Sequence, residues 1–411
     1  MRVLWFETQE PAAYASEKHP YGGWQDSLER IVRTIPEIEL TVAFMSERHT
    51  EVKVVDGVRY IPIFAKWSRA ERLWKKYWDS YVEKVLPGAM SIVRQYKPVL
   101  IQIFGIEWPF GQIAAHTDIP VVIHIMGSIV PYNNAEYSPG YYFQEKLMQC
   151  WRNPRKMYRI WRYGRDDRNR EEWERRTWEL VNDYMGRTQW DYALSKVMHP
   201  GRRYYHVEEG LHPVFVSKEF KWARPKDGKI HLISIGIGGF RKGPDMMLKV
   251  ACILTTLGLD FEWNVAGQID CATKLIVEKR VGISFEDSHI KILGFIQPEE
   301  LVEKLCASTM YVHTAYIENS PNSICEAQCL GVPVVSTNVG GIATLVRQDV
   351  DGILVAANDP WQMADAIVEL AKDPDRMQRY SENTRVFALA RHNDENIKKQ
   401  LMDCYCSLIR K

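Results

Sequence analysis

Residues 311–341 have the sequence YVHTAYIENSPNSICEAQCLGVPVVSTNVGG, which contains a strand, a loop, a helix and a second strand in that order. The apolar run 310–314 predicts a buried strand. Ser320-Pro321-Asn322-Ser323 has the composition of a helix start, and Leu330-Gly331-Val332-Pro333 leads tightly into the next strand at 332–336. Two strands joined by a crossover helix are the unit of a parallel α/β sheet.

The same alternation extends over the rest of the chain. In the second half we expect strands at 230–236, 261–267, 289–293, 310–314, 332–336 and 353–355. In the first half we expect strands at 2–6, 39–45, 58–64, 99–104 and 120–126, with a helix that begins near Gln25. The polar segment 218–228 separates the two halves. The pattern therefore predicts two α/β domains, whose ligands lie at the carboxyl ends of the strands.

Length and composition limit the possible classes of protein. A chain of 411 residues is too long for one ordinary core and suits two domains. Hydrophobic residues make up 46% and charged residues 26%, which is typical of a globular protein. The formal net charge of +1 argues against a nucleic acid as partner.

The sequence gives no sign of export or of membrane insertion. The apolar run in MRVLWFETQEP is too short for a signal peptide, and no stretch approaches the roughly 18 apolar residues of a membrane span. The eight cysteines include no C-x-x-C pair, and no metal-ligand cluster is visible. We therefore expect a cytoplasmic protein without a bound metal or cofactor, whose cysteines are mostly buried thiols.

Two glutamates carry the strongest chemical signal. Glu318 and Glu326 lie on either side of the expected helix start, where amides near Asn322 and Ser323 are placed to bind a phosphate. Glu326 is suited to accept hydrogen bonds from a ribose, and Glu318 from a sugar. The alternative is that both carboxylates are solvated surface groups.

The spacing of these glutamates resembles the E-x7-E signature of family 4 glycosyltransferases, and the resemblance runs over nearly the whole chain. Further motifs similar to that family's are Gly22-Gly23, Glu209-Gly210-Leu211, Lys242-Gly243, Gly294-Phe295 and Gly340-Gly341. The resemblance implies the α/β GT-B fold, with two Rossmann-like domains facing a central cleft and a C-terminal helix that crosses back to the first domain. The implied divisions are an acceptor-binding domain at 1–220, a nucleotide-sugar-binding domain at 221–380 and the returning helix at 381–411.

The resemblance also implies roles for individual residues. Glu318 contacts the transferred sugar, Glu326 the ribose, and Lys242 the diphosphate. The other residues expected to bind the donor are Asn322, Ser323, Ser320, Phe295, Gly22 and Gly23.

Three positions, Gly236, Met126 and Thr344, depart from the family's pattern, and Thr344 stands where a glutamate is common. Gly236 stands where an arginine is usual, and we expect Arg241 to take over its catalytic role beside Lys242. Met126 stands where a histidine is common, so the acceptor side is assigned to His124 and Met126 together.

Two stretches combine basic and aromatic residues. Residues 151–165, WRNPRKMYRIWRYGR, contain six basic and no acidic residues, and residues 66–78, KWSRAERLWKKYW, likewise combine basic and aromatic side chains. Such segments suit the surface of an anionic membrane. For 66–81, where Trp67, Trp74, Trp78 and Tyr81 share one helical face, packing on the domain's own sheet is the competing interpretation.

The predicted function is retaining, metal-independent transfer of a sugar from a nucleotide diphosphate. The expected acceptor is a saccharide or a lipid-linked intermediate of surface polysaccharide synthesis, at the inner face of the membrane. A non-catalytic sugar-nucleotide-binding protein is the alternative. An epimerase is disfavoured by the E-x7-E motif, and a glycoside hydrolase is disfavoured because it would hold both carboxylates around one bond. An NAD-dependent oxidoreductase is weaker, because Arg241 replaces the third glycine of G-x-G-x-x-G after Gly236 and Gly238.

Overall fold

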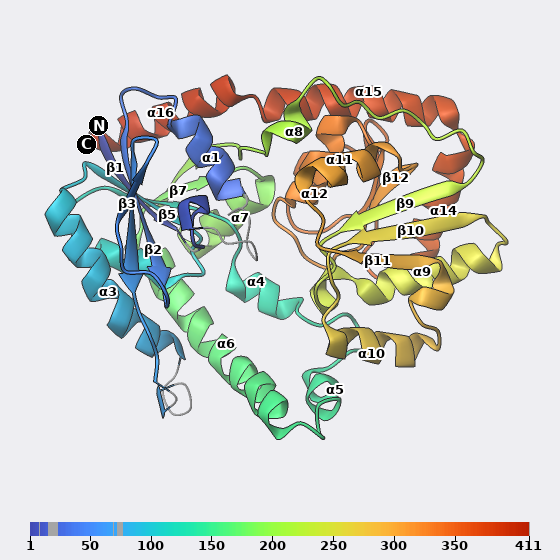
Figure 1. Ribbon diagram of the computed structural model, residues 1–411, viewed down its shortest axis with the longest axis horizontal. Coiled ribbons are helices and arrows are strands. Elements are labelled where there is room, and N and C mark those ends of the chain that lie inside the picture. The colour runs from blue at the N-terminus through green and yellow to red at the C-terminus, as the bar shows by residue number, and fades with distance from the viewer. Residues whose placement is uncertain (8, 15–23, 69, 72–76, 411) are drawn as a thin grey trace. The chain divides into compact units, whose positions relative to one another are not determined.

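The computed structural model describes the chain except residues 8, 15–23, 69, 72–76 and 411. It forms two compact units, each built on one sheet (Figure 1). The first unit consists of Met1–Val130, Tyr163–Leu211 and Arg391–Lys411, and the second of Pro131–Arg162 and His212–Ala390. The prediction of two α/β domains is confirmed.

The first unit contains an eight-stranded sheet in the order β3-β4-β2-β1-β5-β6-β7-β8. Its strands are β1 (Arg2–Glu7), β2 (Glu39–Ser46), β3 (Lys53–Val55), β4 (Val58–Phe64), β5 (Leu100–Phe104), β6 (Val121–His124), β7 (Asp183–Gly186) and β8 (Arg203–His206). All neighbouring pairs are parallel except β3 with β4, which form an antiparallel hairpin.

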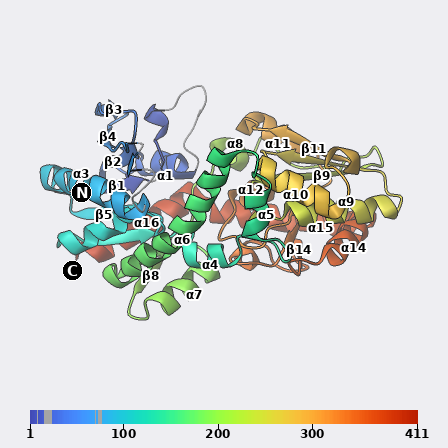
Figure 2. The same cartoon turned by 90° about the horizontal axis from the view of Figure 1, so that it is seen from below.

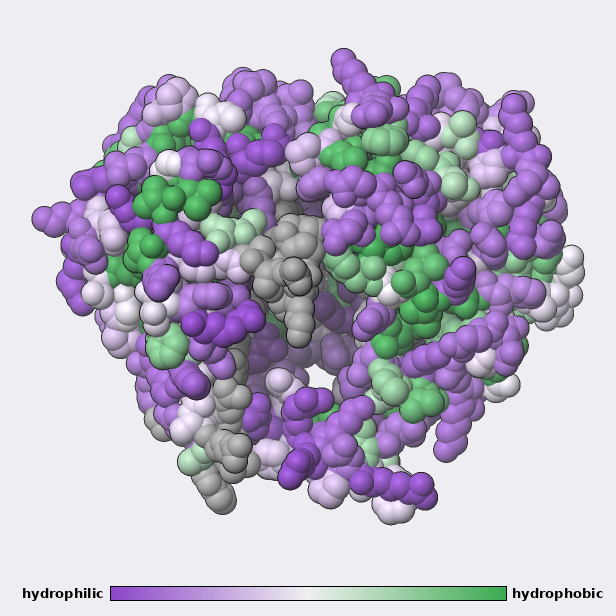
Figure 3. Space-filling model, in the orientation of Figure 1, coloured by the Kyte–Doolittle hydropathy of each residue, from purple (hydrophilic) through white to green (hydrophobic). Residues whose placement is uncertain are grey.

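Side chains alternate along β1 between the two faces of this sheet. Leu4 and Phe6 enter one apolar core, and Val3 and Trp5 enter the other. The main helices of this unit are α1 (Trp24–Val32), α3 (Tyr77–Tyr96), α7 (Gln189–Met198) and α16 (Asp394–Ile409), and α6 (Pro154–Leu180) begins in the second unit and ends in the first. Both faces are therefore buried, and the outer surface drawn in Figure 3 is mainly hydrophilic.

The second unit contains a six-stranded, fully parallel sheet in the order β11-β10-β9-β12-β13-β14. Its strands are β9 (Ile230–Ile235), β10 (Phe261–Ala266), β11 (Ile290–Gly294), β12 (Met310–His313), β13 (Val334–Thr337) and β14 (Gly352–Val355). Its main helices are α9 (Pro244–Thr256), α10 (Cys271–Val281), α11 (Pro298–Cys306), α12 (Asn322–Leu330), α14 (Pro360–Lys372) and α15 (Pro374–Arg391). Each predicted strand of this half is present within about two residues of its predicted ends.

Residues 131–162 pack with the second unit, although the expected first domain ran from 1 to 220. Polar contacts account for this difference. Ser138 Oγ donates to Asp245 Oδ1 over 2.7 Å, and the Arg280 guanidinium lies 2.6 Å from Glu145 Oε1. Helix α5 (Phe143–Met148) accordingly lies beside α10 in both views (Figures 1 and 2).

The expected returning helix, 381–411, consists of two parts. Helix α15 belongs to the second unit up to Ala390, and α16 belongs to the first. Between them, Asn393 caps α16 by accepting from the amides of Glu395 and Asn396. Tyr405 on α16 accepts a hydrogen bond from Trp5 Nε1 over 2.9 Å, which fixes this helix on the first sheet.

The two basic aromatic stretches differ in burial. Trp67 precedes the helix rather than lying in it, is 4% exposed, and stacks on Tyr81 with ring centroids 5.4 Å apart. The interpretation that this stretch packs on its own domain is therefore correct for Trp67 and Tyr81. Trp74 lies outside the described residues, and the side chain of Trp78 is not described. Within 151–165, by contrast, Trp151 and Trp161 are 60% and 45% exposed. In the described part of the chain, no helix combines the length and hydropathy that crossing a membrane requires.

Candidate active site

The candidate site of the second unit lies in the loop that joins β12 to α12. This loop starts at the carboxyl end of a central strand and carries Glu318, which is 7% exposed. On the neighbouring strand β9, the chain continues through a glycine-rich loop into the short helix η3 (Phe240–Lys242). Both loops therefore begin at the same edge of the sheet, where parallel α/β sheets bind ligands.

The structure brings Glu318 and Lys242 into direct contact. Lys242 Nζ donates to Glu318 Oε1, and the two form an ion pair. Burial alone raises the pKa of Glu318, but Lys242, His313 and Arg241 together hold that pKa below its ordinary value. Glu318 is therefore an ionised carboxylate in a buried position, with a cation beside it.

Two glycines allow close backbone contacts that fix the position of this loop. A Cβ added to Gly243 would lie 1.9 Å from the carbonyl oxygen of Thr314, and a Cβ added to Gly340 would lie 1.8 Å from that of Glu318. Both glycines have positive φ angles, 72° and 54°. The amide of Gly341 donates to the Glu318 carbonyl oxygen over 2.9 Å. These contacts fix the position of Glu318 through its main chain.

Arg241 is adjacent to Lys242 in the sequence, and its positive charge acts on Glu318. Its guanidinium carbon is 4.6 Å from the centroid of the Tyr132 ring, and its Nε is 4.0 Å from Glu136 Oε2. Its carbonyl oxygen accepts from the amide of Tyr316 over 2.7 Å. Because Arg241 also lowers the pKa of Glu318, its charge acts on the same site.

Helix α12 begins at Asn322, as predicted, and its N-cap residue Pro321 supplies no side-chain cap. Within the described residues, the amides of Asn322 and Ser323 donate to no backbone carbonyl. Ser320 is 8% exposed in the preceding loop, and Glu326 is half-buried one turn into the helix. The first turn of α12 therefore presents N–H groups without a helical carbonyl partner, the arrangement that binds anions.

The remaining predicted donor contacts are less enclosed. Phe295 follows β11 and is 63% exposed, and Gly294 before it has φ 76°. Gly22 and Gly23 lie outside the described residues. Their predicted role in phosphate binding stays a prediction.

His124 and Met126 belong to the first unit. His124 ends β6, is fully buried, and stacks on Phe104 with centroids 5.8 Å apart. Burial, aided by Arg187, lowers the pKa of His124 well below its ordinary value. Met126 lies beyond the strand, with its sulfur 3.9 Å from Gln25 Nε2. The acceptor-side role of both residues stays a prediction.

The structure adds residues that the sequence interpretation omitted. His313 ends β12 and is 5% exposed, and Tyr311 contacts both His313 and Ser323. Asp245 is fully buried and accepts from Tyr316 and Ser138. His313 is the last residue of a strand that was predicted, and Asp245 comes two residues after the Lys242-Gly243 pair, so their positions beside these motifs were their only signal.

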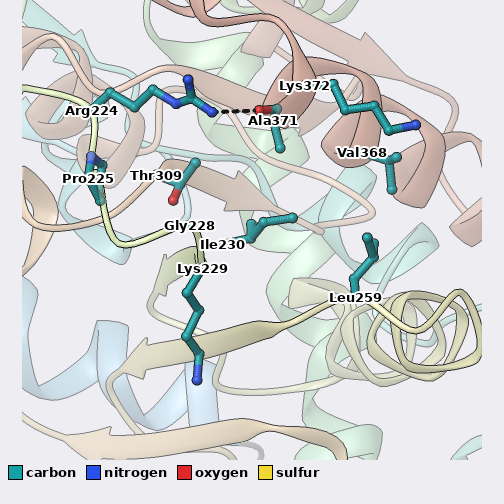
Figure 4. Close-up of a pocket in the computed structure, with 10 residues that line it drawn as sticks. All are labelled: Arg224, Pro225, Gly228, Lys229, Ile230, Leu259, Thr309, Val368, Ala371 and Lys372. Atoms are coloured by element: carbon teal, nitrogen blue, oxygen red, sulfur yellow. Dashed lines mark hydrogen bonds between the residues drawn. The ribbon is translucent and has the colours of Figure 1, made fainter.

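A cavity of about 170 Å³ lies elsewhere in the second unit, where β9 begins (Figure 4). Three cationic residues line it, and each has a partner in the protein. Arg224 donates to the carbonyl oxygen of Ala371, Lys229 pairs with Asp260, and Lys372 pairs with Glu369. The cavity is at the amino ends of the strands, opposite the Glu318 loop, so it is not the candidate active site.

Part of the chain matches a known protein family. Residues 216–387 match the family model described as glycosyl transferases group 1. A D-inositol 3-phosphate glycosyltransferase of Corynebacterium urealyticum is 37% identical over 177 residues, which are 41% of this chain and 40% of that protein. The chain thus spans about two fifths of the length of this curated relative.

Solved structures resemble the whole chain. Sucrose-phosphate synthase from Thermosynechococcus elongatus has a TM-score of 0.75 at 16% identity, covering 100% of this chain and 99% of that one. Anabaena Alr3699/HepE in complex with UDP and glucose has a TM-score of 0.66 at 15% identity, covering 99% and 100%. At these identities the likeness shows the fold alone, which is GT-B. Residues 216–387, which hold Lys242, Glu318 and Glu326, identify this chain as a GT-B protein with the domain of the group 1 glycosyltransferases.

Proposed function

We propose that the protein transfers a sugar from a nucleotide diphosphate to an acceptor with retention of the anomeric configuration and without a metal ion. The observation that carries this proposal is the contact between Lys242 and the buried Glu318, within the domain that matches the group 1 glycosyltransferases. One group is cationic and suits a diphosphate, and the other accepts hydrogen bonds and suits a sugar.

Stabilisation of the leaving group is the main catalytic task in this proposal. When the anomeric bond breaks, negative charge develops on the diphosphate. Lys242, Arg241 and the amides of Asn322 and Ser323 at the start of α12 are the donors for that charge. One such donor typically contributes roughly 3 kcal/mol to lowering the barrier. Protein cations thereby take the part that a divalent metal plays in other transferases.

The experiment that tests this proposal first identifies the sugar nucleotide and then follows the reaction. Thermal unfolding is measured with UDP, GDP and ADP and with their common sugars, because a ligand at 100 times its dissociation constant stabilises by about 2.7 kcal/mol. The sugar nucleotide that stabilises the protein is then incubated with saccharide and lipid-linked acceptors. NMR of the product reports the anomer. An inverted product, or activity lost in EDTA and restored by Mg²⁺ or Mn²⁺, would overturn the proposed mechanism.

We expect the alanine variants of Glu318 and Glu326 to lose different properties. Glu326→Ala weakens the free nucleotide diphosphate and the nucleotide sugar alike, by about 1.5 to 3 kcal/mol for charged hydrogen bonds. Glu318→Ala lowers turnover and leaves the free diphosphate bound, because its contact is with the sugar. Calorimetry with the diphosphate alone separates the two. A Glu326→Ala protein that keeps its nucleotide affinity would show that the roles are assigned wrongly.

A lipid-linked acceptor requires contact with a membrane surface, and we propose that residues 151–165 make it. Trp151 and Trp161 are exposed, as are Arg152, Arg155 and Arg159. Each basic residue near an anionic surface contributes about 1 kcal/mol, and salt screens this attraction.

Flotation with phosphatidylserine-containing liposomes tests this surface. Changing Arg155, Lys156, Arg159 and Arg162 to Ser is expected to abolish binding at physiological salt. The matched control removes the same charge from exposed positions elsewhere in the second unit, Lys226, Lys279, Lys372 and Arg379. Equal loss in both variants would point to net charge rather than this surface, and equal binding of the first variant and the wild type would exclude it.

A further inference from the structure

His313 is a buried polar side chain at the candidate site that no step above uses. It is the last residue of β12, five positions before Glu318, and only 5% of it is exposed. Its ring stacks on that of Tyr311 with centroids 6.1 Å apart. The imidazole is thus buried where the strand passes into the loop that carries Glu318.

The hydrogen bonds around Tyr311 fix the tautomer of this histidine. The Tyr311 hydroxyl donates its single hydrogen to Ser323 Oγ over 2.8 Å. Its oxygen is also 3.1 Å from His313 Nδ1, so in that contact Nδ1–H donates and the oxygen accepts. Burial lowers the pKa of His313 to about 4, so the ring is neutral near pH 7. A neutral ring protonated at Nδ1 carries a lone pair on Nε2.

That lone pair has no partner within the described residues, although Nε2 is buried. Buried polar atoms without a partner are uncommon, and each calls for an explanation. The ion pair beside it is close enough to act on the ring, because Glu318 raises the pKa of His313 and Lys242 lowers it. A lone pair accepts hydrogen bonds, so an ionised phosphate cannot satisfy it and a hydroxyl can.

Building on the proposed function, we infer that Nε2 of His313 accepts a hydrogen bond from a hydroxyl of the transferred sugar. A diphosphate that draws Lys242 away from Glu318 opens the pair, and the attached sugar then meets Glu318 and His313 together. Tyr311 and Ser323 are positioning residues, since they set the tautomer. The donor is therefore a sugar that keeps a free hydroxyl at the position facing β12.

Three substitutions at one position test this inference. In His313→Gln, the amide oxygen reaches the place of Nε2 and accepts in its stead, whereas in His313→Asn the shorter side chain reaches only the place of Nδ1. His313→Leu removes both polar atoms. Calorimetry uses the nucleotide sugar selected by thermal unfolding, and the corresponding free diphosphate.

The Asn and Leu variants are expected to bind the nucleotide sugar roughly 5- to 150-fold more weakly, the cost of leaving its hydroxyl unpaired. The Gln variant stays within about threefold of the wild type, less than one ordinary hydrogen bond. All three keep the affinity of the free diphosphate. Deoxy analogues of the sugar provide a second measurement: for one hydroxyl, its removal weakens binding to the wild type and not to His313→Leu.

Several results would overturn the inference. A Leu variant that binds the nucleotide sugar as the wild type does means that another group, such as a buried water, satisfies Nε2. Equal loss in the Gln and Asn variants, or loss of the free diphosphate, means that His313 is structural. Either result leaves the proposed function intact. A wild-type protein that binds no nucleotide sugar overturns the proposed function and the inference with it.

Discussion

Replacement of Lys242 by methionine is expected to lower kcat for sugar transfer by about 10²- to 10³-fold, or roughly 2.7–4 kcal/mol in the barrier. Lys242 is the cation that contacts Glu318, and the proposed mechanism assigns it to the diphosphate as charge develops there. Methionine keeps the unbranched stem and removes the charge. Single-turnover kinetics with the identified donor measure the effect on the chemical step directly.

Lys249 offers a matched control, because it also pairs with a buried carboxylate. Its Nζ lies 2.9 Å from Asp245 Oδ2, and its side chain is 32% exposed against 26% for Lys242. Lys249→Met is expected to lower the unfolding temperature and to leave kcat within a few-fold of the wild type. If both variants lose kcat equally, the loss reflects a disturbed fold, and the assignment of Lys242 to the diphosphate fails.

The second large effect is expected from Gly340→Ala. The new Cβ would lie 1.8 Å from the carbonyl oxygen of Glu318, in a backbone conformation with φ 54°. The loop has to move, and since Gly341 also holds that carbonyl, Glu318 moves with it. We expect a loss of more than about 3 kcal/mol in the free energy of unfolding. Transfer activity should fall to background in the protein that remains folded.

Substitution of Gly258 is a control that separates backbone strain from a steric clash. Its φ angle of 70° is also positive, but no atom lies within 4 Å of an added Cβ. Gly258→Ala is expected to cost about 1–2 kcal/mol, the strain of the left-handed conformation, with unchanged kcat. Urea unfolding of both variants gives the comparison. A Gly340→Ala protein as stable and active as Gly258→Ala would show that the Glu318 loop tolerates displacement.

Much of the fold could be predicted because buried parallel strands have uniform apolar runs. The antiparallel strand β3 was missed, although Asp56-Gly57 between alternating residues is a hairpin signal. Strands β7 and β8 were missed for a different reason. Asp183-Tyr-Met-Gly and Arg203-Tyr-Tyr-His contain charged and polar residues that pair with one another across the sheet edge, as Arg203 does with Asp183. The hydrophobic pattern of a sequence does not show such pairing.

The site was predictable only in part. The spacing of Glu318 and Glu326 and the helix start at Asn322 are local features of one segment. The contact of Lys242 with Glu318 joins residues 76 positions apart, and only the adjacency of β9 and β12 brings them together. The tautomer of His313 depends on Tyr311 and Ser323, whose side chains meet through tertiary packing. No sequence pattern specifies a hydrogen-bond direction.

The packing of α16 has a consequence for the order in which the two units mature during synthesis. Ile397, Leu401 and Tyr405 complete the core on one face of the first sheet, together with residues near the start of the chain. One apolar face of the first unit is therefore expected to stay uncovered until residues 394–409 have left the ribosome. The second unit, by contrast, has all its residues by position 390. We therefore expect the first unit, although it contains the first strands of the chain, to complete its folding after the second.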